Sequence, residues 1–256
     1  MIQSYGLIGY PLSHSFSKKY FTEKFQKENI LNSEYHAFPI DKIELFPLLI
    51  KDNPTLKGLS VTIPYKETVI PFLDELDATA KKIGAVNCIK ISEGKLIGYN
   101  TDAFGFRQSI KPFLESQHER ALILGTGGAS KAVEYVLKEI GIDCYFVTRN
   151  KSTNKQPTTN NQFTYDEVNE HMLNAFKLIV NATPLGMFPN VDACPDIPYQ
   201  FLSPTHLLYD LVYNPAETEF LKRGKAKGAA TVNGYSMLQH QAEEAWRIWN
   251  THSNPQ

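Results

Sequence analysis

A glycine-rich segment in the middle of the chain, Gly125-Thr126-Gly127-Gly128-Ala129-Ser130, constrains the fold more than any other feature. It follows an apolar run, Ala121 to Leu124, that lacks polar alternation, as is typical of a strand in a parallel sheet. It precedes a stretch of helical character, residues 130–140, which Gly141 ends. A strand, a glycine-rich turn and a helix in this order predict a βα unit whose backbone N–H groups can bind a phosphate.

The rest of the chain also alternates between strand and helix patterns. A helix is predicted at 16–28, where apolar residues fall on one face, and another at 43–51, provided that Pro47 lies in its first turn. Further helices are predicted at 102–114 and 237–249. Strands are predicted at 5–9, 35–40, 56–62, 85–91, 95–99, 121–124, 144–148, 178–181, 207–211 and 229–232, with a hairpin joining 85–91 to 95–99.

This rhythm becomes more regular after about residue 103, where successive βα units follow one another. We therefore predict an α/β protein of two domains with a boundary near residue 103. The first would be a smaller α/β layer, and the second a Rossmann-like, doubly wound domain. The polar run 150–162 is predicted to be a loop within the second domain.

The composition is that of an ordinary globular protein: of 256 residues, 42% are hydrophobic and 21% charged. A formal net charge of -1 argues against a nucleic-acid partner. The three cysteines, Cys88, Cys144 and Cys194, form no C-x-x-C pair, so we expect no disulfide framework and no metal. With no readable signal peptide or membrane span, we expect a cytoplasmic protein that does not bind membranes.

The end of the strand after the glycine segment indicates which dinucleotide would bind. NAD-binding folds usually place an acidic residue there, about 20 residues past the glycines, whereas this chain has Thr148 and then Arg149. An arginine can bind the 2′-phosphate of NADP, and a charge-assisted bond of about 1.5–3 kcal/mol corresponds to a roughly 10- to 150-fold preference. The alternatives are a plain glycine-rich turn, with Ser130 in place of the third glycine, and an exposed arginine without a ligand.

A lysine follows the end of a short apolar strand in the first half of the chain. In the segment 58–66 the strand stops near Pro64, and Lys66 comes just beyond it. A strand end can project a side chain into a cleft, where a lysine can act as an acid or a base. Taken alone, however, this residue is better described as a solvated surface lysine, because most lysines lie on the surface.

Together, eight segments resemble shikimate dehydrogenases, in the same order and almost from end to end. In the first half these are 9–17 (GYPLSHSFS), 61–66 (VTIPYK), 84–87 (GAVN) and 100–102 (NTD). In the second half they are 125–130 (GTGGAS), 148–150 (TRN), 181–187 (NATPLGM) and 233–242 (NGYSMLQHQA).

The resemblance implies an NADP-dependent reduction of 3-dehydroshikimate to shikimate, a step toward chorismate and the aromatic amino acids. It implies a substrate-binding domain at 1–103, an NADP-binding domain at 104–235, and a C-terminal helix, 236–256, that packs back on the first domain. Lys66 and Asp102 would form the catalytic acid–base pair. The substrate would contact Ser15, Ser17, Thr62, Asn87, Tyr213 and Gln241. NADP(H) would contact Gly125, Gly127, Gly128, Ala129, Thr148, Arg149, Gly234 and Met237.

Several alternatives stay open at this point. Ser15, Ser17 and Asp102 could instead cap helices, and Gln241 could be an exposed helix residue. A coupled lysine–aspartate pair titrates as a unit, so either member could be the formal proton donor. The substrate could be quinate as well as shikimate, and the same fold could serve a non-enzymatic NADP-binding regulator. The protein could be a monomer or a homodimer.

The chain departs from the family's usual residues at positions flanking the chemical groups. Lys18 stands in place of a proline, Phe21 in place of a histidine and Ser60 in place of an asparagine. Thr148 replaces an asparagine before the cofactor arginine, and Tyr235-Ser236 replaces Leu-Gly. These departures bear on affinity and substrate preference rather than on the type of reaction.

Overall fold

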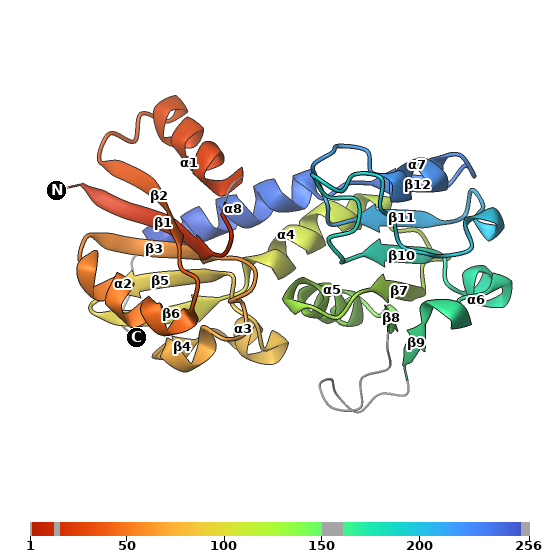
Figure 1. The fold of residues 1–256 in the computed structure, drawn as a ribbon, viewed down its shortest axis with the longest axis horizontal. Coiled ribbons are helices and arrows are strands. Elements are labelled where there is room, and N and C mark those ends of the chain that lie inside the picture. Colours follow the sequence, from red (N-terminus) through yellow and green to blue (C-terminus); the bar gives the residue numbers. More distant parts are fainter. Residues whose placement is uncertain (1, 13–15, 150–160, 252–256) are drawn as a thin grey trace. The chain divides into compact units, whose positions relative to one another are not determined.

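The computed structural model of the chain describes residues 2–12, 16–149 and 161–251 (Figure 1). The described residues form two compact α/β units. One contains the residues up to Thr101 together with those from Gln241 onward, and the other runs from Asp102 to His240.

The first unit contains a six-stranded sheet in the order β2-β1-β3-β5-β6-β4. Strand β5 is antiparallel to its two neighbours, while the other pairs are parallel. The strands are β1 (Gln3–Gly9), β2 (Ser33–Pro39), β3 (Leu56–Val61), β4 (Glu75–Leu76), β5 (Cys88–Ser92) and β6 (Lys95–Tyr99), and the helices are α1 (Phe16–Lys27), α2 (Phe46–Asp52) and α3 (Ala78–Ile83). The hairpin β5–β6 was predicted, although its first strand begins three residues later than expected.

Two local features of this unit follow from backbone chemistry. The helix predicted at 43–51 is a short 3-10 turn, Ile43–Leu45, followed by α2, with Pro47 in the first turn of α2. Helix α3 was not predicted. Asp77 caps it by accepting hydrogen bonds from the N–H groups of Thr79 and Ala80, and Gly84, at φ +69°, ends it.

The C-terminal half of α8 (Tyr235–Asn250) forms part of the core of the first unit. Trp249 packs against Tyr5 and Phe21, with ring centroids 5.2 and 5.3 Å away, and its indole N–H donates to the Ile89 carbonyl at 3.0 Å. A Cβ on Gly58 would clash with the same indole, so β3 needs glycine at this point. The predicted return of the C-terminal helix to the first half of the chain is therefore confirmed.

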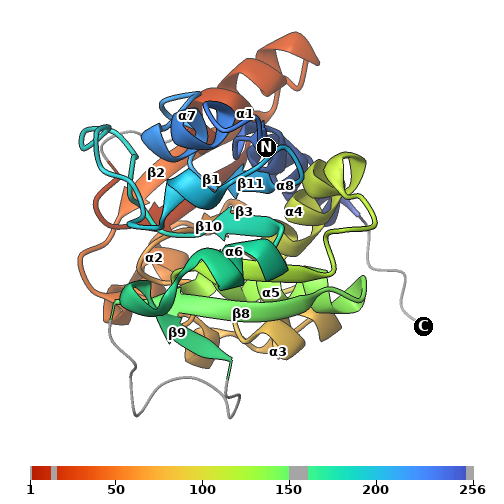
Figure 2. The same cartoon turned by 90° about the vertical axis from the view of Figure 1, so that its right-hand side faces the viewer.

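The second unit is built on a fully parallel six-stranded sheet (Figure 2). Its order, β12-β11-β10-β7-β8-β9, is the 3-2-1-4-5-6 order of a Rossmann-like fold, so the predicted doubly wound domain is confirmed. The strands are β7 (Arg120–Leu124), β8 (Asp143–Thr148), β9 (Gln162–Thr164), β10 (Leu178–Asn181), β11 (Leu207–Asp210) and β12 (Ala230–Val232), and the helices are α4 (Thr101–Ile110), α5 (Gly128–Glu139), α6 (Glu170–Ala175) and α7 (Glu219–Lys225).

The run 150–162, predicted to be a loop, is described only from residue 161 onward. Gln162 already belongs to β9, a three-residue edge strand that pairs with β8 through Phe146, Val147 and Thr148. The prediction is wrong at this position because pairing with β8 holds a short polar segment extended.

Two buried histidines precede strands of the second unit in the same local arrangement. The Nδ1 atom of His118 accepts from the backbone N–H of Glu115 at 2.9 Å, and that of His206 accepts from the backbone N–H of Ser203 at 3.0 Å. Each arrangement requires a neutral imidazole whose proton is on Nε2. Burial lowers the pKa of both side chains.

These histidines should make the protein less stable in mild acid. Because their folded-state pKa is lowered, the unfolded chain takes up protons first as the pH falls below about 6.5, and stability is lost over that range. We expect the urea midpoint of unfolding to drop between pH 7.5 and 5.5. The variant H118N/H206N keeps an acceptor near the Nδ1 position, so its midpoint should fall less over the same range. Parallel pH curves for the two proteins would contradict this assignment.

Candidate functional site

The glycine-rich loop lies at the carboxyl end of β7, where the strand order of the second sheet reverses between β7 and β10. Gly125 has φ +101°, a conformation that favours glycine. A Cβ on Gly125 would lie 2.9 Å from Cγ2 of Thr183 and 3.3 Å from the Ala182 carbonyl oxygen. The loop therefore touches the segment that follows β10, and the two form the crevice in which doubly wound sheets bind ligands.

The start of α5 fits a pyrophosphate group. Gly127 precedes the helix, and a Cβ there would meet no described atom within 4 Å. Among the residues that the structure describes, no side chain caps this helix, so its first N–H groups are left for a ligand or water to bind. Ser130, in the place of the usual third glycine, is fully buried and donates to the Gly127 carbonyl at 2.6 Å. Its small side chain allows close packing of helix and sheet, and Gly128 and Ala129 form the first turn.

Arg149 lies at the same, carboxyl end of the parallel strands as the glycine-rich loop. It follows Thr148, the last residue of β8, and its side chain is exposed. Burial raises the pKa of Tyr165, and the nearby positive charge of Arg149 opposes that rise. Thr148 and Arg149 thus follow the strand next to the glycine loop, where the predicted 2′-phosphate site would lie.

A hydrogen-bonded network that was not predicted fixes the loops after β10 and β11. Asp210, fully buried at the end of β11, accepts from Asn181 Nδ2 at 3.0 Å and from Thr218 Oγ1 at 2.5 Å. Asn181 Oδ1 in turn accepts from Thr183 Oγ1 at 2.6 Å. Burial raises the pKa of Asp210 to about 6, although its hydrogen bonds oppose the rise. In the sequence, the one sign of this network was an aspartate directly after the apolar run Leu207 to Tyr209.

Three of the predicted contact residues lie around the end of β11 and the start of α8. A Cβ on Gly234 would clash with the Leu211 carbonyl oxygen, so only glycine fits this close approach. The Gly234 N–H donates to the Val212 carbonyl at 3.1 Å, and Tyr213 comes next in the chain. Met237 is buried in the first turn of α8, and burial raises the pKa of Tyr213.

Within the first unit, the backbone ties Lys66 to the predicted substrate residue Asn87. The Lys66 carbonyl accepts from the Val86 N–H at 2.7 Å, and the Val61 N–H donates to the Asn87 carbonyl at 2.8 Å. Thr62, directly after β3, donates its N–H to Ile8 at 2.9 Å. Thr62 and Lys66 are half-buried, which argues against a fully solvated Lys66.

Asn87 and Gln241 meet in a polar cluster with Thr101. The Asn87 Oδ1 atom accepts from the Thr101 N–H at 2.6 Å, and its Nδ2 atom donates to Thr101 Oγ1 at 3.0 Å. The Gln241 Oε1 atom accepts from Asn87 Nδ2 and from Thr101 Oγ1, both at 3.4 Å. Gln241 therefore faces other polar groups rather than lying as an exposed helix residue, and Asn87 is buried with its amide held in one orientation.

Asp102 lies in the first turn of α4, and only 6% of it is exposed. Because α4 begins at Thr101, Asp102 lies inside the helix, so the capping alternative does not hold for it. A carboxylate in a first turn is favoured by the helix dipole. Asp102 belongs to the second unit and Lys66 to the first.

Of the two predicted carboxylate-binding serines, Ser15 lies outside the described residues. Ser17 is the second residue of α1 and is half-buried. Burial raises the pKa of Tyr35, and side-chain hydrogen bonds between this residue and Ser60 and Ser17 oppose the rise. Ser17 is thus held near the C-terminal end of β3, on the same unit as Thr62 and Lys66.

Within residues 2–12, 16–149 and 161–251, no cluster of three or more histidine, cysteine, aspartate or glutamate side chains could hold a metal ion. The helices in these ranges are also too short or too polar to cross a membrane.

Comparison with known proteins gives one family for the whole chain. Residues 7–89 match the family model of the shikimate dehydrogenase substrate binding domain. The chain is 37% identical to the shikimate dehydrogenase (NADP(+)) of Methanosphaera stadtmanae, over 95% of this chain and 90% of that protein. It is 39% identical to the enzyme of the same name from Carboxydothermus hydrogenoformans, over 98% and 92%. The crystal structure of shikimate 5-dehydrogenase from Thermus thermophilus, in complex with NADP(H) and shikimate, superposes with a TM-score of 0.82 at 30% identity, over 97% of this chain and 94% of that one.

Proposed function

The chain belongs to the shikimate dehydrogenase family, and from this membership we propose that it catalyses the reversible NADPH-dependent reduction of 3-dehydroshikimate to shikimate. The reaction is a step in the synthesis of chorismate and the aromatic amino acids. The observation that supports this most is similarity over nearly the full length to NADP-dependent enzymes, together with a glycine loop at the switch point of a Rossmann-like sheet.

We assign substrate binding to residues 1–103 and NADP binding to residues 104–235, with the C-terminal residues 236–256 completing the substrate domain. The family-model match at 7–89 and the two compact units support this division. The sheet order of the second unit supports the cofactor half of the assignment.

When bound, NADPH supplies the hydride. Gly125, Gly127, Gly128 and Ala129 would hold its pyrophosphate through backbone N–H groups at the start of α5. Thr148 and Arg149 would hold the 2′-phosphate, because a guanidinium can bind phosphate oxygens in a bidentate manner. Gly234 and Met237 would border the nicotinamide.

The substrate is a small, anionic ring that bears hydroxyl groups. Ser15 and Ser17 would donate hydrogen bonds to its carboxylate. Thr62, Asn87, Tyr213 and Gln241 would bind the hydroxyls. The buried and hydrogen-bonded Asn87 supports this assignment, because a fixed amide loses little freedom when it binds a ligand.

Lys66 and Asp102 would form the acid–base pair. As negative charge grows on the carbonyl oxygen, the Lys66 ammonium can stabilise that charge and donate a proton. Asp102 would orient the ammonium and share its proton. We further propose a cytoplasmic enzyme that is a monomer or a homodimer, needs no metal, and binds neither nucleic acid nor membranes.

The absorbance of NADPH tests this proposal directly. The purified chain should reduce NADP⁺ in the presence of shikimate, and NAD⁺ should be a poorer acceptor. Quinate, run at equal concentration, measures whether the enzyme also accepts the saturated ring. NADP⁺ binding without turnover of either acid would instead favour a non-enzymatic regulator.

A further inference from the structure

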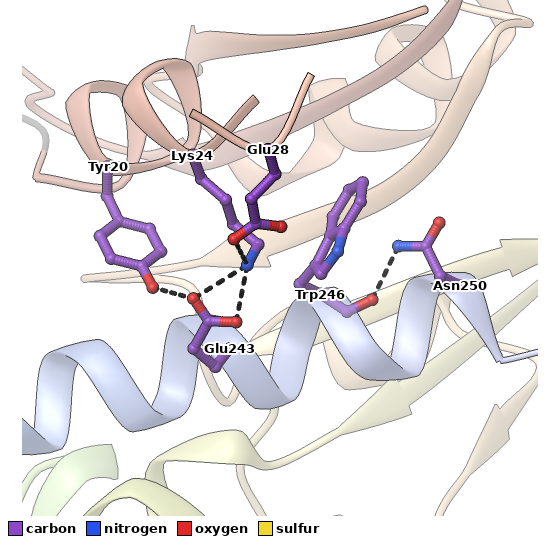
Figure 3. Close-up of polar contacts among 6 residues, drawn as sticks. All are labelled: Tyr20, Lys24, Glu28, Glu243, Trp246 and Asn250. Atoms are coloured by element: carbon purple, nitrogen blue, oxygen red, sulfur yellow. Dashed lines mark hydrogen bonds and ion pairs between the residues drawn. The ribbon is translucent and has the colours of Figure 1, made fainter. Parts of the chain in front are cut away.

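An ion pair whose lysine is buried joins the first and last helices of the first unit (Figure 3). Lys24 of α1 donates from Nζ to both carboxylate oxygens of Glu243 on α8, at 2.8 and 3.0 Å, and to Glu28 at 2.7 Å. The Tyr20 hydroxyl donates to the same carboxylate of Glu243. We refer to Tyr20, Lys24 and Glu243 as the α1–α8 clamp.

The clamp is charged on both sides, and 48% of the Glu243 side chain is exposed whereas the lysine is buried. Only 8% of the Lys24 side chain is exposed. Burial alone would lower the pKa of Lys24, but its hydrogen bonds and the charges of Glu243 and Glu28 raise it overall. Burial alone would raise the pKa of Glu243, but Lys24 and Tyr20 lower it overall. Because the Lys24 ammonium is buried, moving its acceptors away would leave a buried charge without partners, so the pair favours one geometry of the two helices.

The clamp lies on the same two helices as two of the residues assigned to the substrate, Ser17 on α1 and Gln241 on α8. Glu243 is two residues after Gln241 on α8, so the two side chains project about 200° apart around the helix axis. Any rotation of α8 that displaces the Glu243 carboxylate therefore displaces the Gln241 amide as well. On α1, Ser17, Tyr20 and Lys24 are spaced i, i+3 and i+7, which places them on one face.

The end of α8 is restrained by the bond from the Trp249 indole N–H to the Ile89 carbonyl at 3.0 Å, six residues beyond Glu243, while the packing nearer the clamp is apolar. Trp246 lies 5.2 Å from both Tyr5 and Phe25 by ring centroids, and such contacts tolerate small turns of the helix. The hydrogen bonds from Asn87 and Thr101 to Gln241 are long, at 3.4 Å, and restrain the amide weakly. The short bonds of the clamp are charge-assisted and directional, so they restrain rotation more strongly.

We propose that the α1–α8 clamp is a positioning device for substrate binding, which sets the rotation of α8 and so the place of the Gln241 amide beside Asn87 and Thr101. This inference rests on the proposed function, because it assigns Gln241 to the substrate. Glu243, Lys24 and Tyr20 are positioning residues that act through Gln241 rather than by touching the ring.

Kinetics of the full-length protein test the clamp, using shikimate and NADP⁺. E243Q keeps the shape of the side chain and removes its charge, and we expect the KM for shikimate to rise about 2- to 12-fold, the value of one hydrogen bond. The KM for NADP⁺ should rise less than that for shikimate, because Met237 is the one predicted cofactor residue on α8 and the others lie outside that helix. Y20F should shift the shikimate KM in the same direction by about twofold.

A matched control lies one residue away. Glu244 forms an ion pair with Arg247 at 2.6 Å, and 14% of the Glu244 side chain is exposed. Because both partners lie on α8, this pair does not join α8 to α1, so E244Q should leave both KM values unchanged within about twofold. In a Q241A background, E243Q should add nothing, because it acts through the missing amide.

Three results would overturn the inference: equal rises in both KM values, additive effects of Q241A and E243Q, or an E243Q protein indistinguishable from E244Q. If E243Q does not fold, Y20F decides, since it removes one hydroxyl only. Absence of shikimate turnover in the unaltered protein would instead reject the proposed function.

Discussion

Replacing Lys66 with alanine should lower the turnover of shikimate oxidation by about 10²–10⁴-fold, the usual range for losing a positioned general acid or base. The half-buried side chain follows β3, and its carbonyl is tied to Val86 beside the buried Asn87. Truncation removes the ammonium without removing this backbone bond, so the fold should persist. Initial rates at saturating NADP⁺ and shikimate, with circular dichroism of the same samples, measure both quantities.

Lys57 provides the matched control, because it is an exposed lysine on β3 itself. K57A should retain nearly normal turnover. K66R keeps a positive charge but gives up its proton poorly, so it should remain strongly impaired. Near-normal turnover of purified K66A would remove Lys66 from the proton-transfer role and return it to the class of surface lysines.

The Rossmann-like half was predictable because its strands are buried on both faces. Runs such as Ala121 to Leu124 are apolar throughout, and the glycine loop marks where the first of them ends. Short elements carried a weaker signal. Strand β4 has two residues, too few for a period to appear. Helix α3 could have been found, since Asp77 and Gly84 are good capping residues at its two ends.

The features that escaped prediction depend on partners far along the chain. Lys24 lies on an amphipathic helix and has the composition of a surface residue, yet its partner Glu243 comes 219 residues later. Asp210 ends a buried strand, and its role emerges only when Asn181 and Thr218 are brought to it. Periodicity reports which face of an element is apolar, but it does not report which distant polar group will meet it.

Replacing Arg149 with alanine should weaken NADP⁺ binding roughly 10- to 150-fold, the equivalent of a charge-assisted hydrogen bond of about 1.5–3 kcal/mol. Arg149 is exposed and directly follows β8, at the end of the parallel strands that also carries the glycine loop. NAD⁺ lacks the 2′-phosphate, so its binding should change little. Titrations of NADPH and NADH fluorescence with both proteins measure the two affinities without requiring turnover.

Two further variants separate the charge of Arg149 from its geometry. R149K keeps the positive charge but loses the planar fork, so NADP⁺ affinity should fall between those of the unaltered protein and R149A. Arg120 is also exposed but begins β7, at the opposite end of the strands, and R120A should leave both cofactors unaffected. Equal losses of NADP⁺ and NAD⁺ affinity in R149A would place Arg149 outside the 2′-phosphate site, because only a contact shared by both cofactors weakens both.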